Sequence, residues 1–232
     1  MGEIWRRVGV AAWVTVKVCV GLVTALHLYA VALIWVSPPG TILMTQRGLE
    51  GQAVRRGPVP LSEISPHLIR AVIAAEDTRF CSHSGVDFAA IDQALEERRT
   101  DGRVRGASTL TQQTAKNVFF WNGGGYARKA GEAWMAVLID GLWGKRRVME
   151  AYLNVAEWGD GLFGAEAAAR VRFGKSAANL TEREAALLAA VLPSPNKWRA
   201  VNPGPYVSRR AGTLQARMRV VERDGLDDCV WS

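Results

Sequence analysis

Cysteine is scarce in this chain, with three residues among 232. Cys19 lies inside a long apolar run, so only Cys81 and Cys229 remain for a disulfide. These two could pair in an oxidising compartment, but one spacing does not decide it, and the pairing stays open. Because neither C-x-x-C nor H-E-x-x-H occurs, a zinc site held by the protein is not expected, and no residue is assigned to a metal.

The chain has fewer acidic than basic residues, and its sequence lacks the alternation of apolar and polar residues that is typical of β-strands. The 29 lysines and arginines outnumber the 22 aspartates and glutamates, which gives a net charge of +7. Such a charge serves solubility, or it attracts an anionic lipid surface or a diphosphate. A basic cluster, Arg98, Arg99, Arg103 and Arg105, directly precedes Gly106. Because period-2 alternation and internal repeats are absent, the chain is predicted to be mostly α-helical.

A long apolar run near the N-terminus predicts one membrane span. Residues 8–36 are almost entirely apolar, with Lys17 and His27 as the ionisable exceptions. The window 18–36 is about 28 Å long as a helix, close to the roughly 30 Å of a hydrocarbon core. A cleaved signal peptide is the alternative, but its apolar region is shorter and ends in a small-residue site that 37–40 lacks.

The basic residues around this span indicate its orientation. Arg6, Arg7 and Lys17 precede it, and no lysine or arginine follows until Arg47. The N-terminus is therefore predicted to be cytoplasmic and the remainder exported, which makes nucleic acid a poor partner.

The rest of the chain divides into a linker and one domain. We expect the anchor at 1–37, an irregular linker at 38–60 with room for a short extended piece, and a helical domain at 61–232. Ser65 and Thr181 are typical helix N-caps, the second in a capping box with Glu184. Helices are predicted at 66–77, 88–99, 108–119, 126–143, 146–153, from Thr181 to a stop at Pro193, and 206–224.

Two glutamates are predicted to point into apolar helix faces. Glu76 falls on the stripe of its helix that carries Leu68 and Val72, whereas Asp77 falls off that face. Partial burial tends to raise the pKa of a carboxyl group toward the range of proton transfer, although a buried ion pair with arginine is the alternative. Glu132 lies on the same helix face as Ala136 and Ile139. Two inward carboxylates are the minimal equipment for acid–base chemistry at a glycosidic centre.

The segment GASTLTQQTAKN, residues 106–117, concentrates hydrogen-bond donors at a helix start. Its hydroxyls, amides and lysine suit phosphate oxygens, with Lys116 as a compact positive charge. An N-capped surface helix is the simpler alternative. His83 is expected to be a structural hydrogen-bonding residue.

These segments together resemble the motifs of the peptidoglycan glycosyltransferase family, and in particular its monofunctional biosynthetic members (family 51), which lack a penicillin-binding domain. The match runs in order over about 60–195. It comprises EDTRFCSHSGVD (76–87), GASTLTQQTAKN (106–117), RKAGE (128–132), KRRVMEAYLNVAEWGDGLFG (145–164) and AAARVRFGK (167–175).

The resemblance implies a lysozyme-like helical domain with a small membrane-abutting lobe, behind one transmembrane helix. It implies that lipid II is polymerised into glycan strands with release of undecaprenyl diphosphate. A divalent cation, Mg²⁺ or Mn²⁺, would bridge the substrate diphosphate. The implied partners are lipid II, the lipid-linked glycan strand, the membrane and other cell-wall synthesis and division proteins. The implied location is the bacterial inner membrane, with a periplasmic catalytic domain.

By motif position, the resemblance assigns Glu76 as the base and Glu132 as the donor-side carboxylate. Lys116 and Arg128 would hold the diphosphate, and Ser108 and Gln113 would bind the donor. The full substrate-binding set is Asp77, Phe80, Ser108, Thr109, Gln112, Gln113, Lys116, Asn117, Arg128 and Lys129. The chain departs from the family pattern at Thr114, Gly124 and Arg172, where an aliphatic residue, an arginine and a tyrosine are usual.

Two other functions compete with polymerisation. A lytic glycan hydrolase on the same fold is disfavoured because it has no diphosphate to bind. A non-catalytic membrane scaffold is disfavoured because both glutamates are present.

Overall fold

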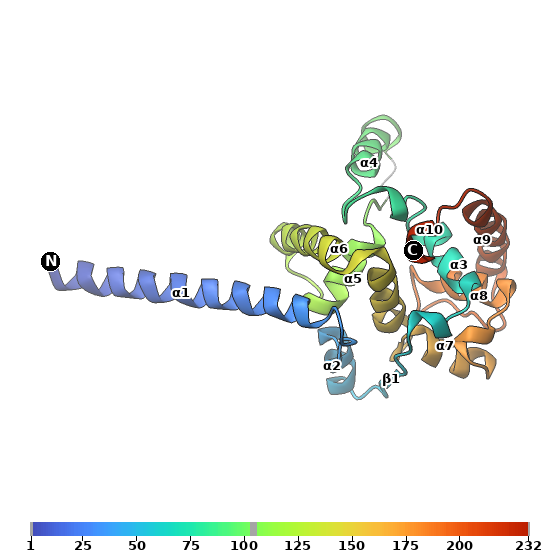
Figure 1. Cartoon of the computed structure of the whole chain (residues 1–232), viewed down its shortest axis with the longest axis horizontal. Coiled ribbons are helices and arrows are strands. Elements are labelled where there is room, and N and C mark those ends of the chain that lie inside the picture. The colour runs from blue at the N-terminus through green and yellow to red at the C-terminus, as the bar shows by residue number, and fades with distance from the viewer. Residues whose placement is uncertain (1, 103–105, 232) are drawn as a thin grey trace. The chain divides into compact units, whose positions relative to one another are not determined.

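The structure is a computed structural model that describes residues 2–102 and 106–231 (Figure 1). The chain divides into two units, residues 1–37 and 38–232. The described part is mostly helical, as predicted.

The first unit is the single helix α1, Gly2–Ala32. Residues Trp5–Ala32 are long and apolar enough to cross a membrane, the one such segment among the described residues. This supports a single-pass anchor. The regular helix ends four residues before the predicted limit at Val36, although the Val36 N–H still donates to the Ala32 carbonyl at 3.3 Å.

The segment 38–60, expected to be irregular, holds regular structure and groups with the second unit. It contains α2, Ile42–Leu49, whose first turn is capped by the Thr41 side chain, and β1, Arg55–Arg56. Arg47 binds Glu157 through two hydrogen bonds, Nε to Oε1 at 3.1 Å and Nη2 to Oε2 at 3.2 Å. β1 lies where a short extended piece was allowed for, but the helix α2 was not expected, because the contact of Arg47 with Glu157 has no local sequence signal.

The helices of the second unit begin and end close to the predicted limits. Ser65 and Thr181 cap α3 and α8 as expected. Gly144 breaks α6 with φ 69°, so its two halves match the two predicted helices. The helices are α3 Pro66–Glu76, α4 Phe88–Asp101, α5 Leu110–Phe119, α6 Gly125–Val155, α7 Ala165–Phe173, α8 Glu182–Val191, α9 Pro205–Arg223 and α10 Asp228–Trp231, with 3₁₀ turns η1 Leu61–Glu63, η2 Phe80–Ser82 and η3 Ala177–Asn179.

Besides α2, sequence reasoning did not anticipate α7, the short helix α10 or a small sheet in the order β1-β3-β2. β2 is Glu157–Gly159 and β3 is Leu162–Phe163. β1 pairs with β3 in parallel, and β2 pairs with it antiparallel. Strands of two or three residues are too short to show alternation in the sequence.

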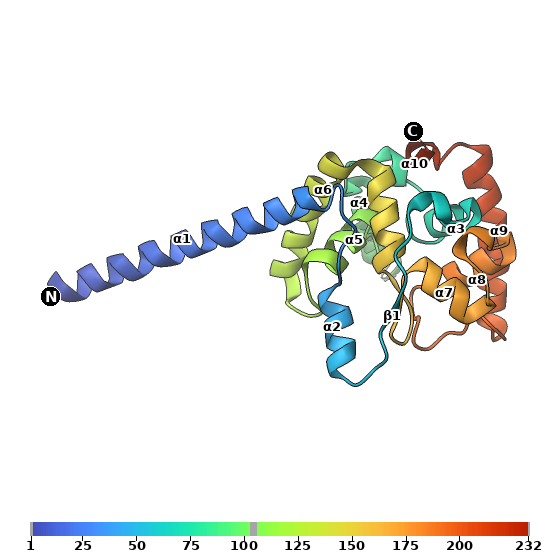
Figure 2. The same ribbon diagram turned by 60° about the horizontal axis from the view of Figure 1, so that its bottom comes forward.

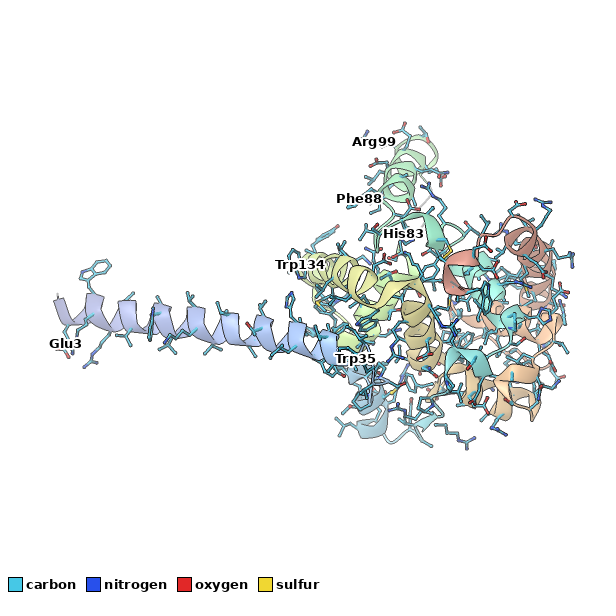
Figure 3. All side chains as sticks on the ribbon, in the orientation of Figure 1. Glu3, Trp35, His83, Phe88, Arg99 and Trp134 are labelled. Atoms are coloured by element: carbon cyan, nitrogen blue, oxygen red, sulfur yellow. A yellow bond between two sulfur atoms is a disulfide. The ribbon has the colours of Figure 1, made fainter. Side chains whose placement is uncertain are left out.

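The core forms where α3, α8 and α9 pack on one another, while α5 packs along α6 (Figure 2). Leu68, Ile69, Val72 and Ile73 of α3 are fully buried, as the predicted stripe requires. Helix α4 stands clear of the other helices of this unit (Figure 1), and its Phe88 and Arg99 project outward (Figure 3).

The C-terminal segment is joined to the turn that follows α3. A disulfide links Cys81 of η2 to Cys229 of α10 across 148 residues of chain. It lies beside His83 (Figure 3). Arg70 of α3 adds an ion pair to buried Asp227, with Nε 3.0 Å from Oδ2. The pairing left open by the sequence therefore occurs.

Candidate active site

Glu76 is partly buried as predicted, whereas Asp77 is more buried than predicted. Glu76, the last residue of α3, is half-buried, whereas the Asp77 side chain is only 5% exposed. Asp77 is the C-cap residue, with φ −161°, so its side chain leaves the helical course on which the face prediction depended. The prediction for Asp77 was wrong for this reason.

Asp77 holds two segments in place. Its carboxylate accepts hydrogen bonds from the backbone N–H of Leu110 at 2.9 Å and from Nε2 of His83 at 3.0 Å. The first contact attaches the start of α5 to the end of α3. Asp77 therefore acts mainly as a structural residue, and His83 is the hydrogen-bonding residue that was expected.

Glu76 lines a pocket of about 200 Å³ between the end of α3, the start of α4 and the segment before α5. Ser108 and Thr109 line the same pocket, together with Arg79 before η2 and Gln93 of α4. Glu76 accepts a hydrogen bond at Oε2 from Gln113 Nε2, at 3.0 Å. A carboxylate with solvent access and one fixed oxygen suits a general base.

The start of α5 is built by a reciprocal cap. The Thr109 hydroxyl accepts from the Gln112 N–H, and the Gln112 amide oxygen accepts from the Thr109 N–H, both at 3.0 Å. Thr109 also donates to the carbonyl of Gly85 at 2.6 Å. Both side chains are buried and satisfied by the protein, so the structure favours a capping role over a direct substrate contact for Gln112 and Thr109.

Gly85 permits the close contact between this turn and α6. Its φ is +82°, and a Cβ there would lie 2.5 Å from the carbonyl oxygen of Ala136. A larger residue would push the turn that carries the first motif off the helix that carries Glu132.

Three cations gather next to the pocket. Lys129 Nζ lies 2.8 Å from Ser108 Oγ and 3.2 Å from Glu132 Oε2. Arg128 forms an ion pair with the same glutamate. Ser108 thus connects the pocket of Glu76 to the cluster formed by Lys116, Arg128 and Lys129.

The lysines of this cluster carry a high local positive charge. Burial lowers the pKa of Lys116, and the nearby Arg128 guanidinium lowers it further. Burial, Arg128 and Lys116, in that order, lower the pKa of Lys129. Such repulsion among cations is relieved when an anion binds between them, which fits a phosphate site.

Glu132 is 1% exposed, as predicted from its position on the apolar face of its helix. The buried ion pair with an arginine, which was the alternative considered for Glu76, is formed instead by Glu132 with Arg128. Its charge is balanced by Arg128 and Lys129, which it holds one turn away on α6. Among the described residues, no group of three or more His, Cys, Asp or Glu side chains is placed to hold a metal ion. Because its carboxylate already pairs with Arg128 and Lys129, Glu132 is not placed to act as a metal ligand.

The remaining predicted residues differ in access. Lys116, Asn117 and Gln113 are half-buried on α5 and remain accessible to a ligand. Phe80 is fully buried beneath Lys145, whose Nζ lies 4.7 Å from the ring centroid, so it packs in the core. Of the predicted basic cluster, Arg103 and Arg105 lie outside the described residues, and Arg98 and Arg99 belong to α4.

At each of the three positions that depart from the family pattern, the surrounding structure fits the residue that is present. Thr114 is buried, and its hydroxyl donates to the carbonyl of Leu110 at 2.9 Å. Gly124 is the N-cap residue of α6 with φ +82°, a conformation that an arginine adopts only with strain. Arg172 lies against Gly159, where the missing side chain leaves room for the guanidinium.

Sequence reasoning missed Tyr152 and Lys145. Tyr152 is 2% exposed, and its hydroxyl lies 3.4 Å from Gln113 Oε1. Lys145 Nζ binds Asp140 Oδ1 and the carbonyl of His83, each at 2.6 Å. Both residues fall in the fourth quoted motif, which was the available signal, but the contacts of Tyr152 with Gln113 and of Lys145 with His83 join segments far apart in the sequence.

The chain matches a family model described as transglycosylase over residues 41–220. A biosynthetic peptidoglycan transglycosylase of Rhodospirillum centenum is 51% identical over 214 residues, which cover 92% of this chain and 93% of that protein. The proteins of the same description from Caulobacter vibrioides and Pseudomonas aeruginosa are 49% and 50% identical, over 90% and 79% of this chain and 90% and 82% of their own lengths.

Proposed function

Since the chain belongs to the transglycosylase family, and is thus a peptidoglycan glycosyltransferase with a lysozyme-like helical domain, we propose that Glu76 is the base of its reaction. The substrates are lipid II and the growing glycan strand, and the process is cell-wall synthesis. The observation that carries the assignment is the position of Glu76, half-buried in a pocket that connects through Ser108 to three cations.

The proposed step is a single displacement with inversion. Glu76 takes the proton from the 4-hydroxyl of the acceptor sugar, and that oxygen forms a bond to the anomeric carbon of the donor. The bond from this carbon to the diphosphate oxygen breaks, and undecaprenyl diphosphate leaves with the electron pair. The base raises the nucleophilicity of the hydroxyl, and the cations stabilise the charge on the leaving group.

The cation cluster supports a diphosphate site on the donor side. Lys116, Arg128 and Lys129 supply point charges and a planar guanidinium for phosphate oxygens. Glu132 acts there indirectly, because it orients Arg128 and Lys129 through ion pairs. Ser108 and Asn117 remain proposed donor contacts.

Incubation with purified lipid II tests the function. We expect glycan chains and free undecaprenyl diphosphate without release of muropeptides from preformed peptidoglycan. Release of muropeptides with no polymer would instead indicate a lytic hydrolase, and neither product would favour a non-catalytic scaffold.

We also propose, from the family resemblance alone, that a divalent cation, Mg²⁺ or Mn²⁺, would neutralise the substrate diphosphate. Because Glu132 pairs with Arg128 and Lys129, it would not hold this ion, and the ion's ligands would come from the substrate. A chelator added to the lipid II assay is expected to lower the rate, with recovery on addition of either ion. An unchanged rate in chelator would contradict a metal requirement.

Lys116→Ala is expected to weaken donor binding about 10-fold, because a charge-assisted hydrogen bond is lost. The lowered pKa of Lys116 also sets a pH dependence. Only the protonated amine attracts the anion, so affinity is present below the lowered pKa and falls as pH rises through it. The fall therefore begins below pH 10.5, the ordinary lysine value.

Titration calorimetry with inorganic pyrophosphate at a series of pH values measures this effect. Lys116→Ala should bind more weakly and lose part of the alkaline decline, because one of the titrating lysines is gone. Lys197→Ala, at an exposed position after α8, is the matched control. Equal affinities for the Lys116 variant and the control would remove Lys116 from the site.

The inner membrane is the proposed location, with the N-terminus cytoplasmic and the catalytic domain periplasmic. The position of Arg6, Arg7 and Lys17 in the N-terminal half of α1 supports this orientation. The Cys81–Cys229 bond supports export, since disulfides persist in oxidising compartments. Thiol labelling of the protein taken directly from cells tests it. Reduced Cys81 and Cys229 would contradict export.

Protein partners among other cell-wall synthesis and division proteins are proposed from the family resemblance alone. Crosslinking in cells tests this proposal, and the recovery of no such protein would count against it.

A further inference from the structure

Tyr152 lies behind the proposed base, on the second half of α6. Its ring is 2% exposed, and its hydroxyl donates a long hydrogen bond to Gln113 Oε1, at 3.4 Å. Gln113 of α5 in turn donates from Nε2 to Glu76 Oε2, at 3.0 Å. Three helices therefore meet in one line of side chains that ends at Glu76.

The chemistry of these groups allows one orientation of the Gln113 amide. An ionised carboxylate only accepts hydrogen bonds, so the NH₂ group must face Glu76 and the amide oxygen must face Tyr152. Burial, followed by the negative charge of Glu76, raises the pKa of Tyr152 well above its ordinary value. The hydroxyl thus keeps its proton and can serve as the donor.

This contact leaves one carboxylate oxygen for the reaction. In the part of the chain that the structure describes, Gln113 is the one donor to Glu76, and it binds Oε2. The oxygen Oε1 remains able to accept the proton of a substrate hydroxyl. A base whose second oxygen is held fixed has less orientational freedom to lose on reaching the transition state.

We propose that Tyr152 is a positioning residue for the glycosyl transfer: its hydroxyl orients the Gln113 amide, which orients the Glu76 carboxylate. This inference rests on the proposed role of Glu76 as the base. It changes the role of Gln113, which the motif resemblance placed at the donor. It also explains why this buried position carries a hydroxyl that must find a hydrogen-bond partner.

Tyr152→Phe keeps the ring and removes the hydroxyl. We expect kcat to fall about 10-fold, with KM for lipid II unchanged within about twofold, because the substrate does not touch Tyr152 and only the base is less well oriented. Gln113→Ala is expected to lower kcat about 100-fold, since it removes the direct contact to Glu76. Tyr126→Phe, at a position that is 95% exposed, is the matched control and should retain full kcat.

The double variant separates positioning from packing. If the hydroxyl acts through the amide, Tyr152→Phe lowers kcat in the native background but not in the Gln113→Ala background. The same factor in both backgrounds, or an unchanged kcat for Tyr152→Phe, would overturn the proposal. Glu76→Gln in the same assay distinguishes the hypothesis that Glu76 is the base from the hypothesis that Tyr152 positions it. An active Glu76→Gln refutes the base, whereas an inactive one with a fully active Tyr152→Phe refutes only the positioning role.

Discussion

Replacing Glu76 with glutamine will lower the rate of glycan polymerisation by at least about 100-fold, which is the usual contribution of a general base. The amide has nearly the shape of the carboxylate but does not accept the proton of the acceptor hydroxyl. Because Glu76 is half-buried beside an open pocket, the loss of its charge leaves no buried charged partner unpaired in the core, and the fold should be kept. Lipid II turnover measures the rate, and thermal unfolding checks the fold.

Two further substitutions make this result specific. Glu63→Gln, at an exposed position of η1, removes the same charge elsewhere and should retain full activity. Asp77→Asn should lower stability by about 1–3 kcal/mol, because it disturbs a buried acceptor that holds Leu110 and His83. Near-normal turnover by Glu76→Gln, with a normal unfolding temperature, would refute the assignment of the base.

Removing the Cys81–Cys229 bond will produce a large loss of stability. A cross-link that spans 148 residues lowers the entropy of the unfolded chain, and the loop-closure relation gives about 5 kcal/mol. For a domain of this size, such a loss lowers Tm by about 10 °C or more. Cys229→Ser in the full chain, measured by thermal unfolding in detergent, tests the effect.

The other cysteine provides the control. Cys19→Ser changes a thiol in α1 that forms no disulfide, and it should leave Tm unchanged. Cys81→Ser and the double variant should match Cys229→Ser, because one bond is lost in each case. A reductant should lower the Tm of the native chain to the same value and leave that of Cys229→Ser where it is. If Cys229→Ser and the native chain unfold together, the bond contributes nothing to stability.

Helix limits were predictable because they depend on residues that are near one another in the chain. Ser65 binds the first turn of α3, and Thr181 and Glu184 cap α8 reciprocally. Gly144 breaks α6 at the expected residue. The apolar face of α3 followed from periodicity, and the burial of Leu68 and Val72 confirms it.

The prediction failed where helical geometry stops. Asp77 stands one residue beyond the helix, so its direction is set by the cap and by Leu110 and His83, not by the period of 3.6. The short sheet and α2 were missed because their stabilising contacts, such as Arg47 with Glu157, are far apart in the sequence.

By itself the sequence determined the family, the membrane-spanning length of the N-terminal segment, the helical class and which glutamates to consider. These properties depend on local order and spacing, which the chain carries in any conformation. Only the tertiary structure decided that Cys81 joins Cys229 and that Tyr152 reaches Glu76 through Gln113. Each of these needs side chains from separate helices at one point, and only the packing of those helices brings them together.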